Sequence, residues 1–140
     1  MLTAAEKIRR YCEYQDRSEW EVRRKIAQLL VPQEERNNLI HQLIEEKFVD
    51  DERFAESFIR GKMNQKRWGR IKIRAELMQH GIPSSLFEKK MAEVDDSQYM
   101  ENLRYLADKW QRENPSGERA KMIRHLLSKG YTMDEINNIN

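Results

Sequence analysis

The side chains that could perform nucleophilic, acid–base or metal chemistry in this sequence are few and scattered. The three histidines lie too far apart to share a local metal-binding motif: His41, His80 and His125. The single cysteine, Cys12, excludes an internal disulfide, and its place on an apolar helix face predicts a buried thiol rather than a nucleophile. The sequence has no glycine-rich phosphate loop, no G-x-S-x-G and no H-E-x-x-H motif. We therefore predict no enzymatic activity, no catalytic residues, no metal site and no cofactor.

Two pairs of neighbouring carboxylates, Asp50/Asp51 and Asp95/Asp96, could suggest acid–base or metal chemistry. Each pair falls where a helix is expected to begin. At that place one carboxylate caps the first turn, and the other favours the positive end of the helix dipole. We predict capping for both pairs.

A run of basic residues is the feature that most suggests a binding function. Residues 57–75 contain seven cations and no acid: Arg60, Lys62, Lys66, Arg67, Arg70, Lys72 and Arg74. Such a run suits a phosphate backbone or an acidic protein surface, and the alternative is a solvated helix face. Trp68, at the turn between two helices, either packs inward or stacks on a partner. The residues predicted to contact a partner or DNA are Arg60, Lys66, Arg67, Trp68, Arg70, Lys72 and Arg74.

The composition predicts a helical protein with much surface for its core. Charged residues make up 36% of the 140 residues and apolar residues 39%, yet the formal net charge is only +2. No apolar stretch approaches the roughly 18 residues that span a bilayer, and the first residues show no apolar signal segment. We expect a cytoplasmic protein without a membrane segment.

Helical spacing of apolar residues runs through the whole chain, and no alternating stretch predicts a strand. We predict nine helices: 3–15, 18–30, 33–47, 51–64, 69–80, 84–93, 96–113, 116–128 and 133–139. Four capping boxes mark helix starts: Thr3–Glu6, Ser18–Glu21, Ser85–Glu88 and Thr132–Glu135. Gly81 and Gly130 are expected to end helices in the left-handed conformation, and Trp20 and Trp110 are expected to anchor the core.

Sequence echoes group these nine helices into three sets of three. Val49-Asp50-Asp51 with Phe54 recurs as Val94-Asp95-Asp96 with Tyr99, and two further echoes recur at similar offsets. Repeats of this size indicate stacked helical units that share surface with their neighbours. The predicted fold is therefore all-α, with three tandem three-helix repeats in an elongated, curved array, and a monomer is expected. The predicted boundaries are 1–49, 50–94 (the central, basic repeat) and 95–140.

The central repeat carries a more specific pattern. It consists of Phe48-Val49-Asp50-Asp51-Glu52-Arg53-Phe54-Ala55, Arg60, Arg67-Trp68-Gly69-Arg70, Ile73-Arg74, Glu76-Leu77 and Gly81-Ile82. This order and spacing resembles the RecX family, whose members regulate the bacterial recombinase RecA. The resemblance implies three tandem three-helix repeats. It also implies a non-enzymatic protein that lies in the groove of the RecA–DNA filament and bridges neighbouring protomers.

Such a protein would suppress ATP hydrolysis, strand exchange and coprotease activity of the filament, and so act in recombination, DNA repair and the SOS response. The implied partner is the RecA filament, which is protein plus single-stranded DNA, with weak direct binding of DNA. Two other hypotheses stay open. One is a direct nucleic-acid-binding helical module, because three-helix units with a basic turn can resemble helix-turn-helix modules. The other is a helical adaptor for a different protein.

Overall fold

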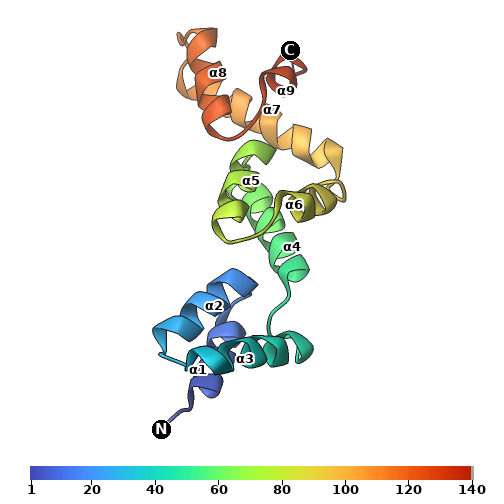
Figure 1. Ribbon diagram of the computed structural model, residues 1–140. Coiled ribbons are helices and arrows are strands. Elements are labelled where there is room, and N and C mark those ends of the chain that lie inside the picture. The colour runs from blue at the N-terminus through green and yellow to red at the C-terminus, as the bar shows by residue number, and fades with distance from the viewer. Residues whose placement is uncertain (140) are drawn as a thin grey trace.

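The computed structural model describes residues 1–139, and within that range the protein is built from helices without a strand. The helices follow one another as three groups of three along an elongated array, with the first group at one end and the third at the other (Figure 1). The elements are α1 Ala4–Tyr14, α2 Glu19–Gln28, α3 Gln33–Glu45, α4 Asp51–Gly61, the π-helical turn η1 Lys62–Lys66, α5 Arg70–Gln79, α6 Ser84–Met91, α7 Asp96–Glu113, α8 Arg119–Ser128 and α9 Met133–Asn137. The predicted helical repeat fold is confirmed.

Local side-chain caps explain where most helices begin. Three predicted capping boxes are confirmed, at Thr3, Ser18 and Thr132, where the hydroxyl accepts from the backbone amide of a glutamate three residues later. The predicted box at Ser85–Glu88 is wrong. Helix α6 begins at Ser84 after Pro83, which takes the N-cap position and offers no side-chain acceptor. Ser85 therefore lies inside the first turn, where it cannot cap.

The paired carboxylates divide their roles. Asp50 caps α4 by accepting from the amide of Arg53 at 3.1 Å, and Asp95 accepts from the amide of Ser97 at 2.9 Å, so the capping prediction is confirmed for these two. Asp51 makes a contact that its position in the sequence does not predict. Its carboxylate accepts from the amide of Glu19 at 2.8 Å and so binds the start of α2, in another repeat.

The hydrophobic core is divided in two. One cluster of eight buried residues lies between Ile8 and Val49, and a larger cluster of eighteen extends from Phe54 to Ile136 through the second and third groups of helices. Trp110 packs half-buried against the larger cluster. Trp20 is not the core anchor expected, because 41% of it is exposed and it lies against Gly81, beyond the edge of the smaller cluster. The first three helices thus have a core of their own.

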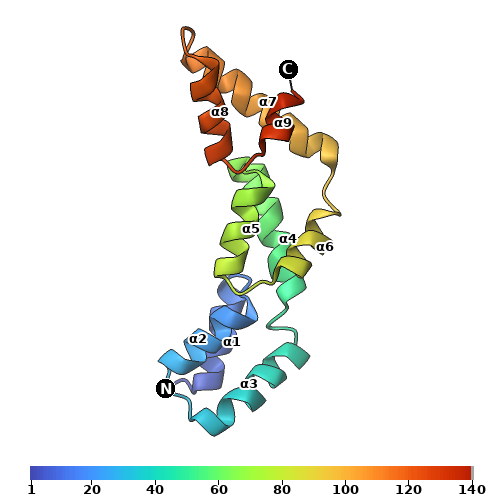
Figure 2. The ribbon, with the colours of Figure 1, turned by 45° about the horizontal axis from the view of Figure 1, so that its top comes forward.

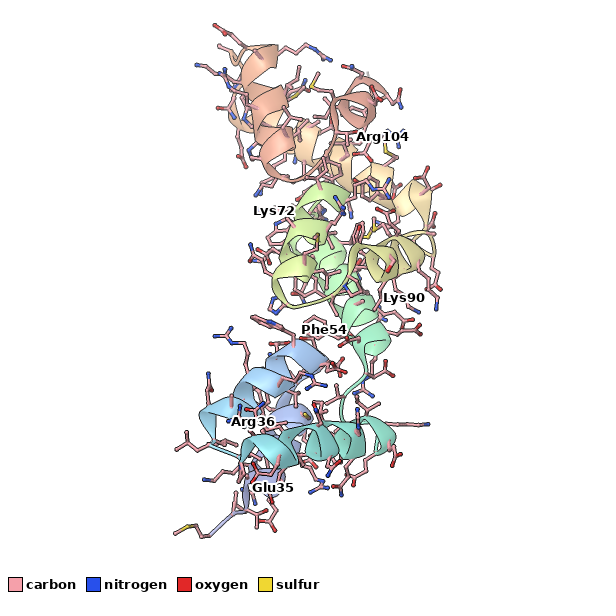
Figure 3. All side chains as sticks on the ribbon, viewed as in Figure 1. Glu35, Arg36, Phe54, Lys72, Lys90 and Arg104 are labelled. Carbon is pink, nitrogen blue, oxygen red and sulfur yellow. The ribbon has the colours of Figure 1, made fainter. Side chains whose placement is uncertain are left out.

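Polar contacts join the first group of helices to the second. Besides the bond from the Glu19 amide to Asp51, Asp16 accepts from the Ser57 hydroxyl at 2.9 Å and pairs with Arg53 at 3.2 Å. Figure 3 places Phe54, at the start of the larger core, just beyond this joint. The joint between these two groups is therefore fixed by hydrogen bonds and charges more than by shared apolar packing.

The second and third groups are joined at the start of α5. This helix has no side-chain cap from its own neighbours, because its N-cap is Gly69. The amides of this N-cap and of the first two helical residues donate instead to the third group: residue 69 to the Lys129 carbonyl at 2.7 Å, residue 70 to the Tyr99 hydroxyl at 2.9 Å, and residue 71 to the Gly130 carbonyl at 3.1 Å. A Cβ on Gly69 would lie 2.4 Å from the backbone of Gly130, so the contact needs glycine.

The remaining backbone features shape the ends of helices. Gly81 and Gly130 have φ of +78° and +103°, which confirms the predicted left-handed stops. The fourth helix ends close to residue 64, as predicted: α4 continues as the π-helical turn η1, which ends at Lys66 before Arg67, whose φ of 53° is left-handed. Within residues 1–139, no helix is long and apolar enough to cross a membrane.

Candidate binding surface

The cations of the central basic run differ in the contacts that they make. Arg60 and Lys66 are exposed and have no hydrogen-bond or ion-pair partner among residues 1–139. Arg70 pairs with Glu88 at 3.5 Å, and Arg74 donates to the Ser84 hydroxyl at 2.9 Å, so both reach toward α6. The run therefore combines two unpaired cations with two that are already engaged.

Arg67 stabilises the turn between η1 and α5. Its backbone is left-handed, its guanidinium lies 3.8 Å from the ring centroid of Tyr105, and its carbonyl accepts from the Tyr131 hydroxyl at 2.7 Å. Burial raises the pKa of that Tyr131 hydroxyl well above its usual value, so it stays protonated and continues to donate. Both ends of Arg67 are thus engaged with the third group of helices.

Trp68 packs inward. Only 9% of it is exposed, and it belongs to the larger core. The ammonium groups of Lys62 and Lys72 lie 4.7 Å and 4.4 Å from the centroid of its ring. Of the two positions expected for this ring, the structure has the packed one, in which the tryptophan positions two lysines.

A different grouping of charge becomes visible once the helices are placed in space. The second helix of each group, α2, α5 and α8, lies along the same side of the array in both views (Figures 1 and 2). Together these three helices carry nine cations and three acids. The cations are Arg23, Arg24, Lys25, Arg70, Lys72, Arg74, Arg119, Lys121 and Arg124. Three of them already have partners within the protein: Arg23 pairs with Glu19, Arg70 pairs with Glu88, and Arg74 donates to Ser84. We call the three helices the second-helix row.

On the first and third helices of the groups, acids balance or outnumber the cations. The third helices, α3, α6 and α9, hold three cations against six acids, and the first helices are close to neutral. Figure 3 shows Lys72, on the second-helix row, and Lys90 at opposite edges of the second group. Sequence reasoning missed the row because it counted charge along the chain. Counting by position within each repeat could have found it.

The second-helix row also exposes large apolar side chains. They include Ile71 and Met78 on α5 and Leu127 on α8, each at least 41% exposed. A surface that binds only a phosphate backbone gains little from such residues, whereas protein interfaces combine apolar contacts with cations, arginine above all. The row therefore suits a partner that presents protein as well as negative charge.

On the other side of the second group, the charged residues are paired with one another. Lys90, only 7% exposed, donates to Glu56 at 2.6 Å and lies within 3.8 Å of Glu52 and Glu93. The hydrogen bond to Glu56 raises the pKa of Lys90, and the hydrogen bond from Lys89 lowers that of Glu52. Arg60 is among the residues that line a hollow of about 290 Å³ beside this cluster. These mutually neutralised charges stabilise the fold and leave little net charge for a ligand.

The groups considered for chemistry are in structural positions. Cys12 is buried in the smaller core, where desolvation raises the pKa of its thiol to about 11. His41 is exposed, and partial burial lowers the pKa of His125. His80 lies between the rings of the second group and Glu21, 3.8 Å from that carboxylate. Across residues 1–139, no cluster of three or more His, Cys, Asp or Glu could hold a metal ion.

Comparisons with known proteins agree with one another. The family model for the second three-helix domain of RecX matches residues 50–91, and the model for the third matches residues 96–139. A protein from Salmonella paratyphi A named "Regulatory protein RecX" is 33% identical over 136 residues, covering 89% of this chain and 81% of that protein.

A second "Regulatory protein RecX", from Clostridium tetani, is 35% identical over 107 residues, covering 72% of this chain and 49% of that protein. The chain spans about half the length of the first curated relatives it matches. The crystal structure of RecX from Lactobacillus salivarius superposes with a TM-score of 0.90 at 26% identity, covering 97% of this chain and 91% of that one.

Proposed function

Since this chain belongs to the RecX family of regulatory proteins, we propose that it binds the filament that RecA forms on single-stranded DNA and lowers the activities of that filament. The activities concerned are ATP hydrolysis, strand exchange and coprotease action, and the protein works as a monomer in the cytoplasm. It has no catalytic role of its own. The second-helix row is the observation that carries the proposal.

The geometry of the row supports a filament as the partner. Three basic helices in succession along an elongated array offer a long contact that can touch more than one subunit of a repeating assembly. The exposed apolar residues of the row favour a partner that contains protein. A nucleoprotein filament presents both phosphate and protein along its length.

The competing hypothesis is a direct nucleic-acid-binding module, which the same cations could serve. It predicts tight binding to bare DNA with a steep salt dependence. If about four cations met duplex phosphates, the logarithm of affinity would fall with the logarithm of salt at a slope of roughly −3.6. The filament proposal predicts weak affinity for bare DNA and much tighter binding to the filament.

The decisive measurement is the steady-state ATPase of RecA on single-stranded DNA, titrated with this protein below the RecA concentration. We expect suppression at substoichiometric ratios, because one protein that bridges protomers affects several of them. Absence of suppression at equimolar protein would contradict the proposal. Tight binding to bare DNA in the same buffer would then favour the nucleic-acid module.

Charge reversals locate the contact. We expect Lys121→Glu with Arg124→Glu, on the second-helix row, to raise the concentration needed for half-suppression by about tenfold, since each replaces an attractive charge with a repulsive one. Arg60→Glu with Lys66→Glu tests the part of the basic run that lies off the row. Arg104→Glu with Arg112→Glu, at exposed positions on α7, changes the charge by the same amount, so it is the matched control and should change little. An equal effect of all three changes would mean that only net charge matters.

A further inference from the structure

The first group of helices contains a charged surface that its neutral total conceals. Residues 1–49 hold nine cations and nine acids, so the sequence gives no sign of a basic patch there. Nevertheless a hollow of about 410 Å³ against α1 and α2 is lined by four cations and by no acid. The cations are Lys7, Arg10, Arg17 and Lys25. Three of the nine acids lie on α3, at Glu34, Glu35 and Glu45, and the acids on α1 and α2 do not line this hollow.

Aromatic rings alternate with these cations. Tyr14 is 83% exposed and Trp20 is 41% exposed, so both rings can be reached by a partner. The Arg17 guanidinium lies 3.7 Å from the ring centroid of Tyr11 and 5.9 Å from that of Tyr14, and the Arg24 guanidinium lies 4.7 Å from that of Trp20. Exposed rings beside cations can receive a flat, electron-rich group and an anion together.

A second hollow continues this surface toward the second group of helices. It has a volume of about 490 Å³, shares Tyr11 and Lys25 with the first, and adds Trp20, Arg24 and residues at the end of α5. Its one acid, Glu21, is already engaged, because its carboxylate accepts from the amide of Ser18 at 3.0 Å. We call the two hollows together the aromatic–cationic surface.

The cations of the aromatic–cationic surface are not neutralised within the protein. Along residues 1–139, no carboxylate lies within ion-pair distance of Lys7, Arg10, Arg17, Arg24 or Lys25. The cationic groups on the other side of the second group differ, since Lys89 and Lys90 are paired with glutamates there. Five unpaired cations on one surface attract an anionic partner.

We propose that the aromatic–cationic surface binds single-stranded nucleic acid, with unpaired bases stacking on Tyr14 and Trp20 and the phosphates lying against the surrounding cations. Stacking platforms within a basic groove are the general means by which proteins hold single strands without reading their sequence. A duplex keeps its base faces covered, so it would meet only the cations. The inference deepens the proposed function by naming the part of the filament that this surface contacts, the DNA strand.

Anisotropy of a labelled oligothymidine with the full chain, at low salt and without RecA, tests the inference directly. We expect Tyr14→Ala to weaken binding at least about fivefold, because loss of one stacked base costs on the order of 1 kcal/mol or more. Tyr14→Phe keeps the ring and should bind within about twofold of the parent protein. Arg10→Glu should weaken binding, whereas Arg112→Glu, at an exposed position on α7, should not.

Several results would overturn the inference. Absence of binding at low salt, equal binding by the parent and Tyr14→Ala, or equal affinity for a duplex of the same length would each exclude a stacking surface for single strands. Competition by thymidine monophosphate at the oligonucleotide's own affinity would mean a free-nucleotide site. If the variants bound oligothymidine normally but lost suppression of the RecA ATPase, the surface would contact protein. The ATPase of the parent protein tests the proposed function separately.

Discussion

At the scale of single residues, the reactivity of the Cys12 thiol measures how readily the smaller core opens. The thiol is buried there, and desolvation raises its pKa from 9.0 to about 11. Because the thiolate is the reactive form, its population at pH 8 is about a hundredfold lower than that of an unperturbed thiol. We expect a thiol-specific reagent to label the native protein at least about a hundredfold more slowly than the denatured protein. Equal rates would show that the first group of helices opens readily.

The same thiol makes stability depend on pH at the alkaline end. Its folded pKa is above its unfolded value, so the folded state holds the proton more tightly. The contribution is fully present below pH 9 and is lost as the pH rises toward about 11. Replacing Cys12 with Ala should remove this part of the alkaline loss, at the cost of a small cavity.

At the scale of helices, two glycines test whether the contact between α5 and the α8–α9 turn is as close as described. Gly61 lies in a helical backbone with open space around its Cα, so Gly61→Ala should stabilise the protein by about 0.4–1 kcal/mol. Gly69→Ala would place a Cβ 2.4 Å from the Gly130 backbone and should destabilise it by about 1–3 kcal/mol. Urea denaturation measures both. Similar effects of the two changes would contradict the close contact.

Helices and most of their caps were predictable because the signals are local. Thr3, Ser18, Asp50 and Thr132 each bind an amide three residues away, so their partner is present in the same short segment. Contacts between repeats were not predictable in this way. Asp51 resembles an ordinary first-turn acid, but its partner is the amide of residue 19, and only the folded chain brings the two together.

The same distinction explains the candidate binding site. The basic run at residues 57–75 is evident in the sequence, but helix geometry directs Arg70 and Arg74 toward α6 and packs Trp68 inward. The second-helix row joins charges from three separate segments, so a count along the chain does not reveal it. The predicted repeat boundaries and contact residues remain predictions.

At the scale of the whole molecule, two cores of unequal size predict two levels of stability. The first three helices rest on eight buried residues, whereas the remaining helices share eighteen. We expect amide hydrogens of α1–α3 to exchange through openings of lower free energy than those of α5, α7 and α8. Hydrogen exchange with residue resolution checks this, and equal free energies throughout would show a single cooperative unit.

One substitution tests whether the second and third groups of helices unfold together and independently of the first group. Tyr131→Phe removes the hydroxyl that donates to the Arg67 carbonyl and leaves that carbonyl without this partner. We expect protection to fall by about 1–3 kcal/mol in both the second and third groups, and to stay unchanged in the first. A loss confined to the third group would mean that the second folds without it.

The start of α5 also sets an order of events while the protein is being made. The amides of residues 69 and 71 donate to carbonyls of residues 129 and 130, which are synthesised about sixty residues later. At about 5–20 residues per second, the ribosome needs roughly 3–12 s to supply those acceptors. During that interval the first three helices already have every residue of their own core, but α5 lacks its cap. The nascent chain can therefore complete its first three helices early, whereas the second and third groups are completed together, once residues 129 and 130 have been synthesised.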